Sequence, residues 1–303
     1  MATSVEPSTR RCAGCGGSSV RPLYRGLVTC AGCGLVYFPG RVTAAEASRL
    51  YSEDYFNGAE YFDYLADCAC HEANFRQRVR QLARWLPSGG RVFEIGCAYG
   101  LFLRQAAERW RVSGCDIAEG PCRFARDQLG LDARHADFLD IPFARGEVDA
   151  FCLWDTIEHL DAPDAYLDRA AEILPGGGLL ALTTGDVGSL LARARGSRWR
   201  QIHPPTHLWY FSRATMTRTL DRFGFEVVWS KWVGVWRSLG QISYSLTSLG
   251  RAEPSRLHQA VMKTRMGRIQ VFMNTFDLMM IVARRRGRAG RNGLSFPDRE
   301  VRS

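Results

Sequence analysis

The chain has 303 residues, of which 46% are hydrophobic, and a formal net charge of +9. That is enough apolar material for the core of one large domain, or of a medium domain with an appendage. The opening residues, MATSVEPSTRRC, hold no apolar targeting segment, and the longest apolar runs, such as LMMIVA at 278–283, are too short to span a bilayer. We therefore expect a soluble, cytoplasmic protein.

The positive charge is almost entirely arginine, since Lys231 and Lys263 are the only lysines. It is also uneven, because the run RRRGRAGR at 284–291 carries much of the excess. Such a run can bind phosphate or nucleic acid, or it can be a solvated tail after the last strand. We predict the second, with residues 285–303 forming a basic, disordered tail.

Four of the ten cysteines lie near the N-terminus with the spacing C-x2-C-x14-C-x2-C, at Cys12, Cys15, Cys30 and Cys33. A glycine follows the second cysteine of each pair, and glycine takes the positive φ that lets a C-x-x-C turn point two thiolates at one metal ion. The segment RPLYRGLVTC between the pairs is β-prone and can form a hairpin. We predict a zinc ribbon over residues 1–40, in which a structural Zn²⁺ replaces the core that about 40 residues cannot build alone.

Residues 41–90 indicate a helical linker that is aromatic and acidic around Tyr55–Phe56 and Tyr61–Phe62. The spacing of Cys68, Cys70 and His71 within it fits no standard tetrahedral metal site. We expect the cysteines outside the ribbon to be buried free thiols. They are Cys68, Cys70, Cys97, Cys115, Cys122 and Cys152.

From residue 91 onward, strand-like and helix-like segments alternate. The strand candidates are RVFEIGC, RVSGCDI, EVDAFCLWD, GGLLALTTG, FEVVWSKWV and DLMMIVARR. Helical patterns such as LFLRQAAERW and PCRFARDQLG lie between them, the latter ending at Gly130. This alternation predicts an α/β fold in which a parallel sheet carries helices on both faces. Ligands bind such a sheet at the carboxyl ends of its strands.

The first of these strands ends in the turn EIGCAYG, whose glycines let the backbone approach a ligand closely. Asp116 ends the second strand twenty residues after Gly96, the distance expected of a carboxylate that binds ribose hydroxyls. A dinucleotide is disfavoured, because Ala98 and Tyr99 break the G-x-G-x-x-G pattern that a pyrophosphate needs. The Glu94 carboxylate would also repel phosphate, but it suits an ammonium group. We therefore predict an adenosine-type cofactor.

These motifs resemble those of class I S-adenosylmethionine (SAM)-dependent methyltransferases of the bacterial type with an N-terminal zinc ribbon. FEIGCAYG is similar to the family motif E/D-x-G-x-G-x-G, with Ala98 in place of the middle glycine. The resemblance implies a Rossmann-like domain over residues 91–284, with SAM as cofactor and the preceding linker as its lid. Plain packing is the alternative for the linker. The cofactor-binding residues that the resemblance implies are Glu94, Gly96, Ala98, Gly100, Asp116, Ile117, Asp137, Phe138, Trp154 and Asp155. For Asp137, a helix N-cap is the alternative role.

The stretch HPPTHLWYFS at 203–212 follows the fifth strand, and Ser212 is suited to cap the next helix. Similar methyltransferases often carry P-x-H-L-x-x-F-S here, which places the loop at the active-site edge. Two histidines on a proline-rich loop do not make a metal site, and no carboxylate is nearby. A structural role and a role at the acceptor pocket stay open. For the second, we rank His207 first as general base, His203 next and His159 third, with helix packing as the alternative for His159.

A long insertion separates the sixth and seventh strands, at residues 236–273. Its amphipathic, methionine-rich segments predict a cap that covers the pocket and defines the acceptor. Dimerisation is the competing use, which would make the protein a homodimer.

Together these features indicate a SAM-dependent methyltransferase that acts on a small-molecule acceptor at O, N or C, such as a natural product, a sugar or a related metabolite. An RNA methyltransferase is the alternative, favoured by the charge and the ribbon, but WDTIEHL stands where an N/D-P-P-Y/F motif would follow the fourth strand. A non-catalytic SAM-binding partner protein is the alternative of another class. We expect a small molecule as partner and no membrane, and nucleic acid stays open as the less favoured partner.

Overall fold

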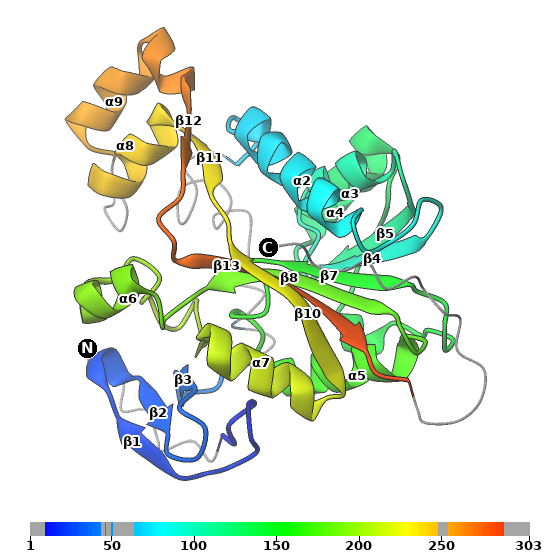
Figure 1. Ribbon diagram of the computed structural model, residues 1–303. Coiled ribbons are helices and arrows are strands. Elements are labelled where there is room, and N and C mark those ends of the chain that lie inside the picture. Colours follow the sequence, from blue (N-terminus) through cyan, green and yellow to red (C-terminus); the bar gives the residue numbers. More distant parts are fainter. Residues whose placement is uncertain (1–9, 44–45, 47–49, 51–63, 248–253, 288–303) are drawn as a thin grey trace.

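A seven-stranded sheet forms the centre of the molecule in the computed structural model, which describes residues 10–43, 46, 50, 64–247 and 254–287 (Figure 1). The linker aromatics at 55–56 and 61–62 and the tail from residue 288 lie outside the described residues. The strand order is β10-β13-β8-β7-β4-β5-β6. Six of these strands match predicted runs: β4 (Arg91–Ile95), β5 (Arg111–Asp116), β7 (Ala150–Trp154), β8 (Leu179–Gly185), β10 (Phe225–Trp232) and β13 (Leu278–Arg285).

The strand that sequence patterns miss is β6 (Asp132–His135). Its sequence DARH has a single apolar residue, Ala133, and only that side chain is buried. An edge strand buries little, so it carries no apolar run for a pattern to detect.

The strands from β8 through β7, β4 and β5 to β6 are parallel. β13 instead pairs antiparallel with both of its neighbours, β8 and β10, so the expectation of a purely parallel sheet is wrong at this strand. The reason is the insertion: the chain leaves β10 and re-enters β13 at the same, carboxyl edge, where Trp232 pairs with Met279. A strand that returns from the edge just left must run in the opposite direction.

Helices cover both faces of the sheet, as predicted (Figure 1). On one face, α2 (Cys68–Leu82), α3 (Leu101–Ala106) and α4 (Glu119–Leu129) bury side chains against Val92 and Cys152. On the other, α5 (Pro163–Ile173) and α7 (Arg213–Arg222) pack against Phe93 and Leu153. Strand residues thus alternate between the two clusters with period two.

Local signals that predicted helix ends are confirmed. Gly130 ends α4 with a left-handed φ of 66°. Ser212 caps α7 in a reciprocal capping box with Thr215. Cys70, Cys97, Cys115, Cys122 and Cys152 are buried free thiols, as expected, whereas Cys68 is a free thiol that is only half-buried.

A second, small sheet joins the N-terminal segment to the body. β1 (Val20–Pro22), β2 (Val28–Cys30) and β3 (Val36–Tyr37) form the ribbon, including the predicted hairpin between the cysteine pairs. Its fourth strand is β9 (Trp209–Tyr210), which pairs antiparallel with β3. The stretch HPPTHLWYFS therefore supplies the strand on which the ribbon docks.

The insertion forms an arm, which we define as described residues 235–247 and 254–273. It consists of β11 (Val235–Ser238), α8 (Leu239–Thr247), α9 (Arg256–Met262) and β12 (Gln270–Met273), and β11 pairs with β12. The arm projects from the carboxyl edge of the sheet, away from the ribbon (Figure 1). A further short helix, α6 (Leu190–Arg195), follows β8. In the part of the chain that the structure describes, no helix is long and apolar enough to cross a membrane.

Candidate active site

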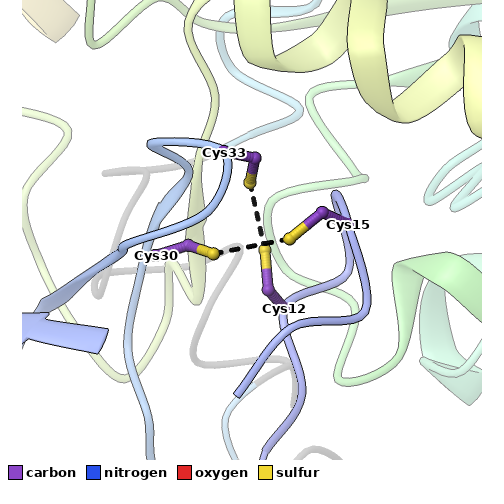
Figure 2. Close-up of side chains that lie close together, drawn as sticks. All are labelled: Cys12, Cys15, Cys30 and Cys33. Carbon is purple, nitrogen blue, oxygen red and sulfur yellow. Dashed lines mark hydrogen bonds between the residues drawn. The ribbon is translucent and has the colours of Figure 1, made fainter. Parts of the chain in front are cut away.

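The four N-terminal cysteines converge on one point (Figure 2). The Sγ atoms of Cys12 and Cys33 are 3.4 Å apart, those of Cys15 and Cys30 are 3.5 Å apart, and all four lie within 4.8 Å of one another. Zn–S bonds of about 2.3 Å in a tetrahedron place sulfurs about 3.8 Å apart. The cluster is therefore compatible with a zinc ribbon.

The ribbon is bonded to the body on two sides. Arg218 of α7 donates from Nη1 to the carbonyl of Cys33 at 2.7 Å, and Arg222 donates to the carbonyl of Ala13 at 3.0 Å. On the other side, the ring of Tyr37 stacks on Trp209 with centroids 5.0 Å apart. Both arginines of α7 bond to carbonyls in the C-x-x-C turns, so these two turns are held against the body.

A cavity of about 490 Å³ opens at the carboxyl ends of β4, β5 and β7. That volume is within the usual range for small-molecule sites. Among the predicted cofactor residues, it is lined by Glu94, Gly96, Ala98, Asp116, Ile117, Asp137, Phe138, Trp154 and Asp155. Gly100 does not line it: a Cβ there would lie 2.8 Å from Leu131, so this glycine serves helix packing.

The turn after β4 is held open by its backbone conformation. Gly96 has φ 79°, and a Cβ at this position would lie 2.7 Å from the side chain of Thr156. Ala98 has φ 42°, the left-handed region that explains why the family motif has glycine there. Asp116 fixes the turn, because its Oδ2 accepts from the amide of Ala98 at 2.8 Å and its Oδ1 from that of Ala118 at 2.9 Å.

Glu94 is the most unusual group of the pocket. Its side chain is 2% exposed, and its Oε2 has no hydrogen-bond partner among the described residues. Burial, together with the charge of Asp116, raises the pKa of this carboxyl well above its ordinary value, while Arg78 opposes the rise. A buried carboxylate oxygen without a donor fits a cationic ligand group such as the ammonium of SAM.

Arg78 lines the same pocket and is the residue that sequence reasoning misses. It is 7% exposed and donates from Nη2 to Oδ2 of Asp155 at 3.0 Å. Its guanidinium lies 5.5 Å from the ring centroid of Trp154. The signal was present, since Phe75, Arg78, Val79 and Leu82 share the buried face of α2 with helical spacing. An arginine at a position of this apolar face is expected to be buried with its charge.

Asp137 is a helix N-cap, the alternative role that the sequence left open, and it also lines the pocket. It caps a short 3-10 helix (Phe138–Asp140), with Oδ1 accepting from the amide of Leu139 at 2.9 Å. The same oxygen accepts from the hydroxyl of Tyr166 at 2.6 Å. Phe138 is buried in an aromatic cluster with Phe93 and its neighbours.

The three candidate histidines lie together, but only His159 lines the cavity. The His207 ring lies edge-on to His159 at 4.5 Å between centroids, and the His203 ring is 3.9 Å from His207. His207 is 8% exposed, and burial lowers its pKa well below the ordinary value. The structure thus places at the cavity the histidine that the sequence ranks third, with His207 packed against His159 and His203 packed against His207.

The ring of His159 has a defined tautomer. Its Nδ1 lies 2.8 Å from the carbonyl oxygen of Thr206, and a carbonyl can only accept, so Nδ1 carries the proton. Burial lowers the pKa of His159 to about 4. The imidazole is therefore neutral at cellular pH, with its lone pair on Nε2.

The expectation that no carboxylate lies near these histidines is wrong, because Glu158 is close to them in the folded protein. Glu158 comes from the loop after β7, and a carboxylate oxygen of it lies within 4.8 Å of nitrogens of His159 and His207, a spacing that could also hold a metal ion. It is 3% exposed, and burial, with the charge of Asp155, raises its pKa to about 8. Its backbone carbonyl accepts from the amide of Leu208 at 2.8 Å, which ties this loop to the strand that carries the ribbon.

A family of proteins described as methyltransferase domain matches residues 69–230, more than half of the chain. The chain belongs to this methyltransferase family. Its sheet order, its glycine turn and the acid that ends β5 agree with that membership. The matched region is a methyltransferase domain with a Rossmann-like fold.

Known relatives of this methyltransferase are distant. The biotin biosynthesis bifunctional protein BioCD of Bordetella avium is 33% identical over 165 residues, which are 48% of this chain and 32% of that protein. A ubiquinone biosynthesis O-methyltransferase of Dinoroseobacter shibae is 28% identical over 152 residues, 46% of this chain and 61% of the relative. The chain thus covers less than two thirds of either relative.

The fold has a counterpart among solved structures. A Bacillus halodurans protein assigned as a methyltransferase aligns with a TM-score of 0.50 and 15% identity, over 70% of this chain and 98% of that one. At that identity, the likeness concerns the fold.

Proposed function

We propose that this methyltransferase transfers a methyl group from SAM to a small-molecule acceptor. The observation that carries the proposal is one cavity that holds both the cofactor motif and a second wall. That wall includes His159 and Leu160 from the loop after β7, and Trp236 and Arg237 from the arm. Both sets of relatives are named for pathways that make small molecules, biotin and ubiquinone.

The residues of the first wall match the polar groups of SAM. Glu94, buried without a donor, would hold the ammonium, and the nearby buried guanidinium of Arg78 would hold the carboxylate. Asp116 would accept from the ribose hydroxyls and Asp137 would border the adenine. When bound, SAM supplies the electrophilic methyl, so the protein contributes orientation and proton removal.

The second wall would serve the acceptor. The neutral ring of His159, oriented by its bond to Thr206, can take a proton from a hydroxyl or an ammonium group. We propose His159 as the general base in place of His207, since His159 lines the cavity and His207 lies behind it.

The ribbon would act as a structural part of this wall. Zn²⁺ held by Cys12, Cys15, Cys30 and Cys33 would stabilise residues 1–40, and β3 would then hold β9 in place. β9 in turn bonds the loop that carries His159, because the Nε1 of Trp209 donates to the carbonyl of Leu160 at 2.8 Å. Residues 236–273 would be the acceptor cap of a methyltransferase domain over 91–284.

The acceptor class can be tested with labelled SAM and an extract of the native cells. We expect label in a low-molecular-mass product that mass spectrometry identifies, and much less label at low SAM concentration when the Asp116→Ala variant replaces the protein. Label that becomes soluble only after ribonuclease treatment would establish the RNA alternative. A protein that binds SAM and labels nothing would be a non-catalytic partner.

The Asp116→Ala variant should bind SAM about 10- to 100-fold more weakly. The change removes a charged acceptor, whose hydrogen bonds contribute roughly 1.5–3 kcal/mol. It also removes the oxygen that holds the amide of Ala98. Calorimetry measures the affinity, with Asp132→Ala, an exposed carboxylate of the neighbouring strand, as control. Unchanged affinity in a folded Asp116→Ala variant would contradict the ribose role.

Binding of SAM should release a proton from Glu94. Without ligand, burial holds the pKa of Glu94 high, and an ammonium placed against the carboxylate must lower it. The affinity for SAM should therefore rise with pH, from the lower pKa that Glu94 has in the complex up to the higher pKa that it has in the free protein. Calorimetry in buffers of different ionisation enthalpy measures the released proton. Glu94→Gln should abolish the release and weaken binding roughly 10-fold or more.

The matched control for this experiment is Glu158→Gln. Glu158 is another buried carboxyl with a raised pKa, but it does not line the cavity. Proton release that persists in Glu94→Gln and disappears in Glu158→Gln would assign the linkage to the wrong carboxyl.

A further inference from the structure

The outer side of the arm combines two kinds of exposed side chain. Between Arg256 and Gln270, every residue is exposed except His258, Val261 and Gly267. The exposed apolar side chains of this segment are Leu257 (60%), Met262 (39%), Met266 (56%) and Ile269 (49%). Interleaved with them are Arg256, Lys263, Arg265 and Arg268, also exposed.

The charge of the arm has one sign. Its described residues contain five arginines and lysines and no aspartate or glutamate. Residues 248–253, which the structure does not describe, add one arginine and one glutamate in sequence, so they leave the balance unchanged. In the described residues, six of the twelve exposed large apolar side chains also lie in this small part of the chain. Such a concentration is typical of a binding surface and not of scattered surface residues.

The inner side of the same segment accounts for the direction of these side chains. His258 is 1% exposed, and its Nδ1 lies 2.9 Å from the hydroxyl of Ser243 on α8. Gly267 is buried beside Met262. The sulfur of Met262 also packs on the inner side, against Gly240 and Gly267, whereas Lys263, Arg265 and Met266 between these positions are exposed.

We propose that the arm docks on the surface of an anionic lipid bilayer. Apolar side chains reach into the boundary between headgroups and acyl chains, and cations on flexible stems contact the anionic headgroups. A second copy of this chain is a poorer occupant, because two arms of the same positive charge would repel each other. This peripheral contact needs no spanning segment, and it revises the expectation of no membrane partner.

Docking through the arm has a consequence for the pocket. Trp236 and Arg237 at the base of the arm line the cavity, and Trp236 of β11 is paired with the exposed Phe272 of β12. This two-stranded sheet therefore joins the lipid-facing segment to the cavity wall. An acceptor that partitions into the bilayer would reach the site from that side.

The test is co-sedimentation of the full chain with vesicles. We expect binding to phosphatidylcholine vesicles that contain about one third phosphatidylglycerol, and none to pure phosphatidylcholine. Binding should fall when salt is raised to about 0.5 M, where the Debye length is about 4 Å. No binding to either vesicle would overturn the proposal.

Two double variants locate the contact. Arg265→Glu with Arg268→Glu should lower the vesicle partition coefficient about 30-fold or more, because each cation at an anionic surface contributes roughly a factor of five. Met266→Ser with Ile269→Ser should lower it at least about 10-fold, because both apolar side chains leave the headgroup boundary. Circular dichroism and SAM affinity should be unchanged in both.

Matched controls make the same changes elsewhere. Arg109→Glu with Arg123→Glu reverses two exposed arginines on the body, and Val20→Ser with Leu23→Ser removes two exposed apolar side chains of the ribbon. Both should bind vesicles as the unchanged protein does. Binding that survives in the arm variants, or that falls equally in the controls, would move the contact to another surface. A dimer in light scattering that the Met266→Ser, Ile269→Ser variant dissociates would assign the arm to a second copy and overturn the proposal.

Discussion

Replacing Cys30 by serine is expected to release the metal ion from the ribbon and to unfold residues 10–43 locally. Four sulfurs form the cluster, and serine removes one thiolate from a closed set. Metal binding contributes on the order of 10 kcal/mol to such small units, whereas the three short strands of the ribbon bury little on their own. Metal analysis should give one zinc per chain before the change and none after it.

The same substitution should lower kcat while leaving SAM affinity near its original value. β9 pairs with β3 of the ribbon, and Trp209 contacts both Tyr37 and the carbonyl of Leu160. Asp161, on the same loop, forms an ion pair with Arg10 and accepts from the amide of Val42 at 3.1 Å. Loss of the ribbon therefore releases the wall that carries His159, but the glycine turn and Asp116 contact other elements.

Hydrogen exchange and calorimetry separate these effects. Amides around Leu208 and Trp209, which donate to the carbonyl of Glu158, should exchange faster in Cys30→Ser. Cys122→Ser is the control, because Cys122 is a fully buried thiol of the body with no part in the cluster. Stoichiometric zinc in Cys30→Ser would refute the metal assignment. Normal turnover by a zinc-free protein would leave the ribbon without a role at the site.

The parts of this architecture that sequence predicts are those with local causes. The run ending at Gly96, the acid Asp116 and the paired cysteines each carry their signal within a few residues. Capping by Ser212 and the end of α4 at Gly130 are equally local, and both are confirmed. Short-range backbone chemistry is sufficient for such features.

The parts that sequence misses depend on contacts between distant segments. The strand Trp209–Tyr210 is two residues long and pairs with residues 36–37, more than 170 positions away. No pattern in either segment indicates the other. His207, which directly precedes this strand in the chain, is buried, whereas His159 lines the cavity. Which of the three histidines lies at the cavity could not be predicted from either segment alone.

Distance in sequence also concealed Glu158 from the histidine loop. Glu158 and His207 are 49 positions apart, yet the backbone of Leu208 bonds to the carbonyl of Glu158. Arg78 is a different case, because its place on the apolar face of α2 was readable. An arginine at an otherwise apolar position of a helix face is a local signal that the sequence itself carries.

Replacing His159 by asparagine should lower kcat about 100-fold or more if its Nε2 removes the proton of the acceptor. Asparagine can place its amide NH₂ near the position of Nδ1 and so keep the bond to the carbonyl of Thr206. The basic nitrogen is lost, but the support of the loop is retained. SAM affinity and the fold should therefore stay unchanged.

The pH profile distinguishes the base from a structural residue. A general base must be unprotonated, so kcat at saturating SAM, where Glu94 has already lost its proton, falls as pH drops through the pKa of the base. Because burial lowers the pKa of His159 to about 4 from 6.5, the rate should stay level through the region near 6.5 and fall only as pH approaches about 4. An acidic limb near 6.5 would point to an exposed histidine instead.

His207→Asn is the matched comparison for this prediction. The His207 ring packs against His159 and does not line the cavity, so its replacement should shift the position of His159 and lower kcat much less than His159→Asn does. A large loss of kcat in a folded His207→Asn variant, with near-normal turnover by His159→Asn, would restore His207 as the base. Near-normal turnover in both variants would make the histidine loop a scaffold, whose function is to present β9 to the ribbon.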